Sequence, residues 1–92
     1  YPDCRPSYYN AFQRVASLGT KRGAEGKKIK ILTPLIRMTK AQIAQLGADL
    51  RVPWELTWSC YKGDQHPCKQ CDSCKLRTKG FKEAKLIDPL QN

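Results

Sequence analysis

The stretch "SCYKGDQHPCKQCDSCKLR", residues 59–77, contains four of the five cysteines of the chain. Their spacing is C-x7-C-x2-C-x2-C, at Cys60, Cys68, Cys71 and Cys74. Two-residue gaps let a tight turn aim two sulfurs at one point, as in structural zinc sites. The last two cysteines fall at the start of a predicted helix, whose N-terminus favours the thiolate form. We therefore expect one structural zinc ion, with no open position for catalysis.

Two other uses of the four thiols remain open at this point. A pair of disulfides is typical of secreted chains, whereas this chain has an odd number of cysteines and no export signal. An iron–sulfur cluster is suggested by C-x2-C-x2-C, but the ferredoxin pattern continues with x3-C-P, and Lys75, Leu76, Arg77 and Thr78 follow Cys74 here. His66 lies inside the loop and could also bind a metal ion. Four cysteines already occupy all four ligand positions of a tetrahedral ion, so we leave His66 out of the ligand set. The pattern favours zinc.

Composition limits what the rest of the chain can be. The 92 residues make one domain or a piece of one, with a thin core. The formal charge of +9 usually indicates a polyanionic partner, so a free-standing basic zinc module that binds RNA or a protein partner is the alternative function. The basic residues are scattered, however, as on solvated surfaces. The sequence shows no secretory signal and no membrane span, which predicts a cytoplasmic protein.

Hydrophobic patterns and capping signals predict a mainly helical segment with one short strand. Thr39 and Gln42 predict a capping box, and Gly47 inside the same helix indicates close packing. The expected elements are a helix over 6–19, a loop over 19–26, a strand over 29–32, and helices over 39–52 and 72–85. In the helix over 39–52 we expect Ile43, Leu46 and Leu50 to face inward. In the helix over 72–85 we expect Leu76 or Arg77, Phe81 and Ala84 to face inward. The chain also begins at Tyr1 without Met, which suggests processing or a longer parent.

Several motifs together resemble a known family. They are "YPDCRP" at 1–6, "LTPLI" at 32–36 with "TKAQI" at 39–43, and "PWELTWSCY" at 53–61 running into "PCKQCDSCKLR" at 67–77. In this order they are similar to the C-terminal part of the 7-cyano-7-deazaguanine synthases, which form preQ0 in the queuosine pathway. The resemblance covers nearly the whole chain. It implies a single C-terminal segment over 1–92, with a helix-strand-helix part at 1–58, a zinc knuckle at 59–78 and a C-terminal helix at 72–86.

The resemblance also implies chemistry. Such enzymes are ATP-dependent ligases of the N-type ATP pyrophosphatase kind, with a Rossmann-like α/β fold. They use ATP with Mg²⁺ to adenylate 7-carboxy-7-deazaguanine, add ammonia to form an amide, and activate it again to form the nitrile. The family's S-G-G-x-D-S pyrophosphate loop does not occur in this sequence. The isolated chain is therefore expected to be inactive and to need an N-terminal ATP-binding half, and its uncovered apolar faces favour self-association.

Asp3, Cys4 and Arg5 form a second candidate site. The guanidinium of Arg5 could pair with a carboxylate or phosphate and could lower the pKa of the neighbouring thiol. The resemblance places this motif near the family's active-site cleft, which predicts a substrate-binding role. The alternative is structural, with Asp3 or Cys4 capping the helix that begins at Pro6. No catalytic residue is assigned from the sequence.

Overall fold

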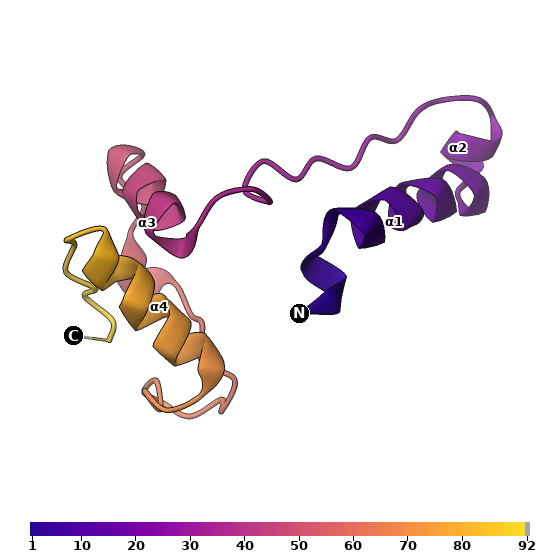
Figure 1. Cartoon of the computed structure of the whole chain (residues 1–92). Helices are drawn as coiled ribbons and strands as arrows, with labels where there is room; N and C mark the ends of the chain where they lie inside the picture. Colours follow the sequence, from indigo (N-terminus) through magenta and orange to yellow (C-terminus); the bar gives the residue numbers. More distant parts are fainter. Residues whose placement is uncertain (92) are drawn as a thin grey trace. The chain divides into compact units, whose positions relative to one another are not determined.

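The computed structural model describes residues 1–91, which fall into two compact units. The first unit runs from Tyr1 to Arg37 and the second begins at Met38. Within the described residues the chain consists of helices joined by irregular segments, with no β-strand (Figure 1). None of the described helices is both long enough and apolar enough to span a lipid bilayer. The chain is mainly helical, as expected, and the expected strand is absent.

The first unit contains one long helix and one short helix. Its elements are the 3-10 turn η1 (Pro2–Cys4), α1 (Pro6–Gly19) and α2 (Lys21–Ala24). Pro6 occupies the start of α1, where its fixed φ and missing N–H cost nothing. The prediction of a loop over 19–26 is wrong in part, because α2 lies inside it. Thr20 explains this helix, since its hydroxyl oxygen accepts a hydrogen bond from the Gly23 N–H at 3.0 Å and caps the first turn.

The strand predicted at residues 29–32 is an extended segment instead (Figure 1). A strand requires a backbone ladder to a neighbour, and no such neighbour exists among residues 1–91. The side-chain amide of Gln13 in α1 forms the hydrogen bonds that a neighbouring strand would otherwise form. Its Nε2 donates to the carbonyl of Ile29, and its Oε1 accepts from the Ile31 N–H at 2.7 Å. The alternation of Ile29 and Ile31 therefore indicated an extended backbone correctly but not its partner.

The second unit begins with α3 (Lys40–Asp49), and its start follows the predicted capping box. The hydroxyl oxygen of Thr39 accepts from the Gln42 N–H at 3.1 Å, and the side chain of Gln42 accepts from the Thr39 N–H at 2.8 Å. The helix ends before the predicted boundary. Arg51 adopts a left-handed conformation with φ of 58°, which closes a Schellman motif with the Val52 N–H.

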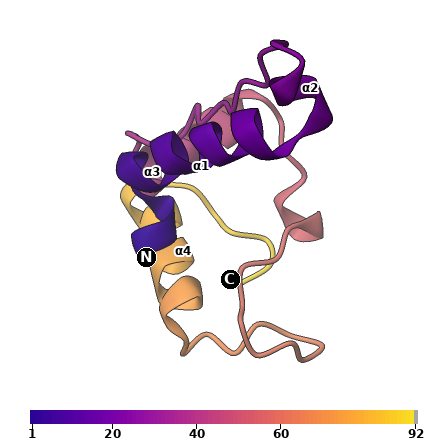
Figure 2. The same cartoon turned by 90° about the vertical axis from the view of Figure 1, so that its right-hand side faces the viewer.

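Two further elements complete this unit, η2 (Trp54–Leu56) and α4 (Asp72–Glu83). Helices α3 and α4 pack against each other (Figure 1), and a long irregular segment leads from η2 to the start of α4 (Figure 2). Gly80 of α4 lies at the point of closest approach, because a Cβ there would stand 2.8 Å from the Cβ of Lys40. The absence of a side chain at position 80 therefore lets α4 approach the first turn of α3.

The core of the second unit is built on the ring of Trp54. The ring packs edge-to-face on Phe81, with centroids 5.1 Å apart and an interplanar angle of 80°. It also lies on Gly47, where an added Cβ would stand 2.7 Å from Cη2 of the indole. The close packing that Gly47 indicated in the sequence is therefore contact with an aromatic ring.

The inward face of α3 differs from the predicted one, whereas that of α4 agrees with the prediction at Arg77 and Phe81. In α3, Ala44 and Gly47 are buried, whereas Leu50, the C-cap of this helix, is 69% exposed. In α4, Arg77 is buried and Leu76 is 39% exposed. The large indole ring explains the change in α3, because it requires small residues opposite it. An apolar pattern alone does not reveal that requirement.

Candidate metal centre

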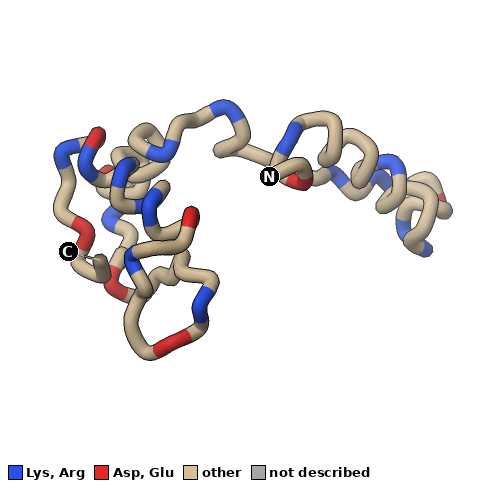
Figure 3. The backbone as a smooth tube through the Cα atoms, turned by 60° about the horizontal axis from the view of Figure 1, so that its bottom comes forward, with Lys and Arg blue, Asp and Glu red and all other residues tan. Residues whose placement is uncertain are grey.

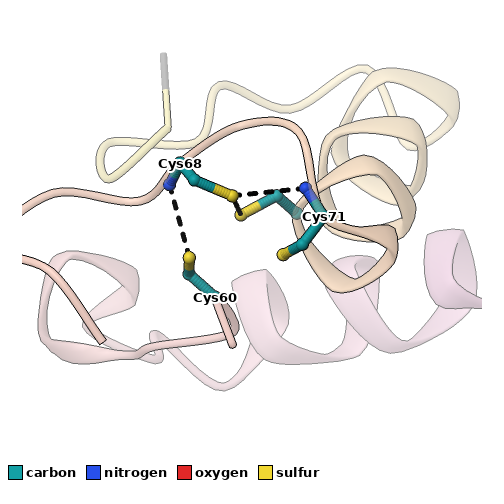
Figure 4. Close-up of side chains that lie close together, drawn as sticks. Cys60, Cys68 and Cys71 are labelled. Carbon is teal, nitrogen blue, oxygen red and sulfur yellow. Dashed lines mark hydrogen bonds between the residues drawn. The ribbon is translucent and has the colours of Figure 1, made fainter. Parts of the chain in front are cut away.

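The four cysteines of residues 59–77 converge in the second unit. The sulfurs of Cys60, Cys68, Cys71 and Cys74 all lie within 4.8 Å of one another. Figure 4 shows three of these side chains directed toward a common point. In a tetrahedral zinc site with Zn–S bonds of about 2.3 Å, the sulfurs stand roughly 3.8 Å apart. The sulfurs of Cys68 and Cys74 are 4.0 Å apart, so the cluster has nearly the size that a metal ion requires.

Three different segments supply these ligands. Cys60 follows η2, and Cys68 lies in the loop before α4. Cys71 is the N-cap of α4, and Cys74 lies in its first turn, as the helix prediction implied. Between the two middle cysteines Lys69 adopts φ of 61°, a left-handed conformation that turns the chain back sharply. This turn aims the two neighbouring sulfurs at the same point.

Backbone N–H groups donate hydrogen bonds to two of the four sulfurs. The sulfur of Cys60 accepts hydrogen bonds from the N–H groups of Lys62 at 3.4 Å and Cys68 at 3.3 Å. The sulfur of Cys68 accepts from Gln70 at 3.4 Å and Cys71 at 3.2 Å. Such donors stabilise negative charge on sulfur. The loop therefore places backbone donors against the sulfurs of Cys60 and Cys68.

The acidity of the thiols supports the same conclusion. Backbone hydrogen bonds from Cys68 and Lys62 lower the pKa of Cys60. Backbone hydrogen bonds from Tyr61 and Cys74 lower the pKa of Cys71 to about 6. In contrast, burial raises the pKa of the Cys74 thiol to about 12. A divalent cation would offset the cost of ionising this last, fully buried thiol, so the donor set fits a metal ion.

The geometry does not support the disulfide interpretation. All five cysteines are free thiols. The 4.0 Å between the sulfurs of Cys68 and Cys74 is about twice the length of an S–S bond. His66 is exposed and does not belong to the group of possible ligands. The group of residues that could hold an ion therefore consists of the four cysteines alone among the described residues, and their role as zinc ligands remains a prediction.

Arg77 holds the Cys60 segment against α4, and sequence analysis missed this role. Its guanidinium donates to the carboxylate of Asp88, to the hydroxyl of Ser59 at 3.3 Å and to the carbonyl of Trp54 at 3.2 Å. Ser59 directly precedes Cys60, so one side chain orients the segment that supplies the first ligand. The signal available in the sequence was an arginine three residues after Cys74, on the same face of the helix.

The second candidate site, Asp3, Cys4 and Arg5, lies in the first unit. All three residues are exposed, and the thiol of Cys4 is 3.9 Å from a carboxylate oxygen of Asp3. The structural alternative is wrong, because the N-cap of α1 is Arg5 and no side chain caps that end. The structure thus assigns no capping role to Asp3 or Cys4, and their substrate-binding role remains a prediction.

Comparisons with known proteins agree with the motifs. The model of the family described as "Queuosine biosynthesis protein QueC" matches residues 1–85. A 7-cyano-7-deazaguanine synthase from Nostoc punctiforme is 59% identical over 90 residues, which cover 98% of this chain and 40% of that protein. The synthases from Thermoplasma volcanium and Acetivibrio thermocellus are 56% and 50% identical, with 37% and 41% of their lengths covered.

The described residues form helices joined by irregular segments, and they carry a four-cysteine knuckle that could hold a metal ion. The chain belongs to the family of the queuosine biosynthesis protein QueC, since the match extends over nearly all of it. It spans about two fifths of the length of the curated relatives that it matches.

Proposed function

We propose that the chain is the zinc-binding C-terminal part of an ATP-dependent ligase that converts 7-carboxy-7-deazaguanine and ammonia to 7-cyano-7-deazaguanine. One observation carries the proposal. The four cysteines that meet within 4.8 Å belong to a chain that matches synthases of that name over 98% of its length. The rest of the ligase would supply the Rossmann-like ATP-binding half of the N-type ATP pyrophosphatase kind.

Zinc is the ion that the donor set supports best. Four thiolates at tetrahedral spacing suit Zn²⁺, and they leave no position for water or substrate. The ion would join the Cys60 segment, the loop around Cys68 and the start of α4, which otherwise share a thin core. Its role would be to stabilise the fold, while the chemistry would take place elsewhere in the ligase.

The reaction assigned to the whole ligase explains why this chain should be inactive by itself. The carboxylate attacks ATP and releases pyrophosphate, and ammonia then displaces AMP to give an amide. A second ATP activates the amide oxygen, which leaves with AMP as the nitrile forms. Both activations require a pyrophosphate-binding loop of the S-G-G-x-D-S form, which this sequence does not contain. We expect no nitrile when the 92-residue chain is given ATP with Mg²⁺, ammonia and the carboxylate, as checked by mass spectrometry.

Metal analysis tests the zinc assignment. We expect one zinc per chain, and we expect Cys60→Ser and Cys71→Ser to lose the metal and to unfold the second unit. Cys4→Ser is the matched control, because its exposed thiol lies outside the cluster, and it should keep one zinc. Iron with sulfide in the purified chain would favour the iron–sulfur interpretation, and a stable metal-free wild type would overturn both.

The basic charge does not by itself favour a free-standing RNA-binding module. Lysines and arginines are spread along the tube in both units instead of forming a single run (Figure 3). RNA binding by the chain that weakens steeply with salt would support that alternative. Filter binding at two ionic strengths measures it directly.

For Asp3, Cys4 and Arg5 we propose contact with the substrate or its activated phosphate in the full-length ligase. Their exposure supports this role, because each side chain is accessible to a ligand. Cys4→Ala in the full-length enzyme tests it. Wild-type kcat and KM would remove Cys4 from the reaction, whereas Arg5→Ala with raised KM and unchanged zinc content would support a binding role.

A further inference from the structure

The segment that follows α4, residues 86–91, turns back along that helix (Figure 1). The reversal is made by Lys85, which adopts a left-handed conformation with φ of 58°. The Leu86 N–H then donates to the Phe81 carbonyl at 2.9 Å, as in a Schellman motif. The match to the family model ends at residue 85, so that match assigns no role to the segment.

Within the segment, Asp88 forms a turn that presents Gln91 to α4. Oδ1 of Asp88 accepts a hydrogen bond from the Leu90 N–H at 3.0 Å, which closes the turn. Gln91 is 8% exposed, and its Nε2 donates to the carbonyl of Cys74 at 3.1 Å. The same nitrogen donates to the hydroxyl of Thr78 at 3.0 Å, one helical turn further on. The segment therefore contacts the residue that supplies the last sulfur of the cluster.

The segment also reaches the first sulfur of the cluster, through Arg77. The carboxylate of Asp88 accepts two hydrogen bonds from the guanidinium of Arg77. This guanidinium also donates to the hydroxyl of Ser59 at 3.3 Å, and Ser59 directly precedes Cys60. The position of Cys60 is therefore tied to the same segment by one side chain.

The two cysteines that the segment reaches are the buried ones. Cys60 and Cys74 are 6% and 0% exposed, whereas Cys68 and Cys71 are half-buried. A chelator that arrives from solvent can displace the more accessible thiolates first, but the ion leaves only when the buried thiolates separate as well. Local opening of this region therefore limits how fast the ion is lost.

We propose that residues 86–91 act as a clamp that slows the loss of the metal ion. Gln91 and Asp88 are its positioning residues, which hold the Cys74 and Cys60 ends of the cluster without binding the ion. Hydrogen-bond partners of metal ligands typically change metal affinity by about 10–100-fold when they are removed. This inference rests on the zinc ion of the proposed function and adds the residues that retain it.

Gln91 offers a variant that separates retention of the metal from stability. Its Oε1 is buried and has no hydrogen-bond partner in the part of the chain that the structure describes. A buried acceptor without a partner costs free energy, which offsets part of what the Nε2 bonds contribute. Gln91→Met keeps the length of the side chain but removes both the donor and this oxygen. Its free energy of unfolding should therefore change little, whereas the contact with Cys74 is lost.

Transfer of zinc to an excess of pyridylazoresorcinol, a chelator that changes colour when it binds the ion, tests the clamp in the 92-residue chain. We expect Gln91→Met to hold one zinc and to release it at least about tenfold faster than the wild type. Ser59→Ala, which removes the hydroxyl at the other end of the clamp, should also release it faster. Thr39→Ala is the matched control, because it loses stability through the capping box of α3 and leaves the clamp intact, so it should release zinc at the wild-type rate.

Urea unfolding of the same samples distinguishes a clamp from general destabilisation. Release that accelerates in all three variants in proportion to their lost free energy of unfolding would overturn the inference. A wild-type release rate in either Gln91→Met or Ser59→Ala would also overturn it. The zinc content of the wild type separates the two proposals, because a wild type without zinc rejects the proposed function, whereas one zinc with unchanged release in the variants rejects the clamp alone.

Discussion

Arg77 and Asp88 form a buried ion pair with two hydrogen bonds. Nε of the arginine lies 2.6 Å from Oδ2, Nη2 lies 3.0 Å from Oδ1, and both side chains are 6% exposed. The same guanidinium binds Ser59 and the carbonyl of Trp54. The pair therefore connects α4, the C-terminal segment and the segment that leads into the cysteine cluster.

Asp88→Asn is expected to destabilise the second unit by about 3 kcal/mol or more, because it leaves a buried guanidinium without its counter-charge. Urea unfolding of the zinc-loaded chain measures the loss. Glu83→Gln is the control, since it removes an exposed pair with Lys79 at 3.7 Å and should change stability by less than about 1 kcal/mol. Equal losses in the free energy of unfolding for the two variants would contradict the larger contribution expected of the buried pair.

Metal affinity should rise with pH across the neutral range. The pKa of Cys74 stands at about 12 without a cation, so its thiol is still protonated at pH 7.5 and must lose that proton when the ion binds. Release of a proton on binding means that affinity increases as pH increases. Calorimetric titration with zinc in two buffers of different ionisation enthalpy should show at least one proton released per ion at pH 7.5. Binding without proton release would contradict the arrangement of the thiols.

Gly47→Ala is expected to destabilise the second unit by about 1–3 kcal/mol, although alanine is the better helix former. The added Cβ would overlap the ring of Trp54, which must then move away from Phe81. Tryptophan fluorescence during urea unfolding reports both the stability and the ring environment. Gln45→Ala, at an exposed position of the same helix, should change stability by less than about 0.5 kcal/mol. A stabilised Gly47→Ala variant would contradict the packing described here.

Cys4 should be the one cysteine that reacts with iodoacetamide in the zinc-loaded chain. Its thiol is exposed, whereas the other four belong to the cluster and would be bound to the ion. Intact-mass spectrometry should show a single adduct before chelation and five after chelation and denaturation. Peptide mapping then locates the first adduct. Rapid modification of Cys68 or Cys71 before chelation would argue against a filled site.

Signals that act over a few residues predicted the structure well. Thr39 and Gln42 form the expected capping box, because both partners lie within one helical turn. Pro6 begins α1 for a similarly local reason. The cysteine spacing also predicted that the thiols of residues 60–74 would meet. The alternation of Ile29 and Ile31 also indicated an extended backbone correctly. A strand, however, needs a neighbouring strand for its backbone hydrogen bonds, and residues 1–91 do not supply one.

The sequence by itself determined where the helices begin and which thiols converge, because capping and ligand spacing depend on neighbours along the chain. Only the tertiary structure decided that Arg77 meets Asp88 and Ser59, that Trp54 rests on Gly47, and that an amide side chain holds the extended segment. These contacts join residues 7 to 18 positions apart. Their formation depends on how the segments pack in three dimensions, and apolar or charge patterns do not encode that packing locally.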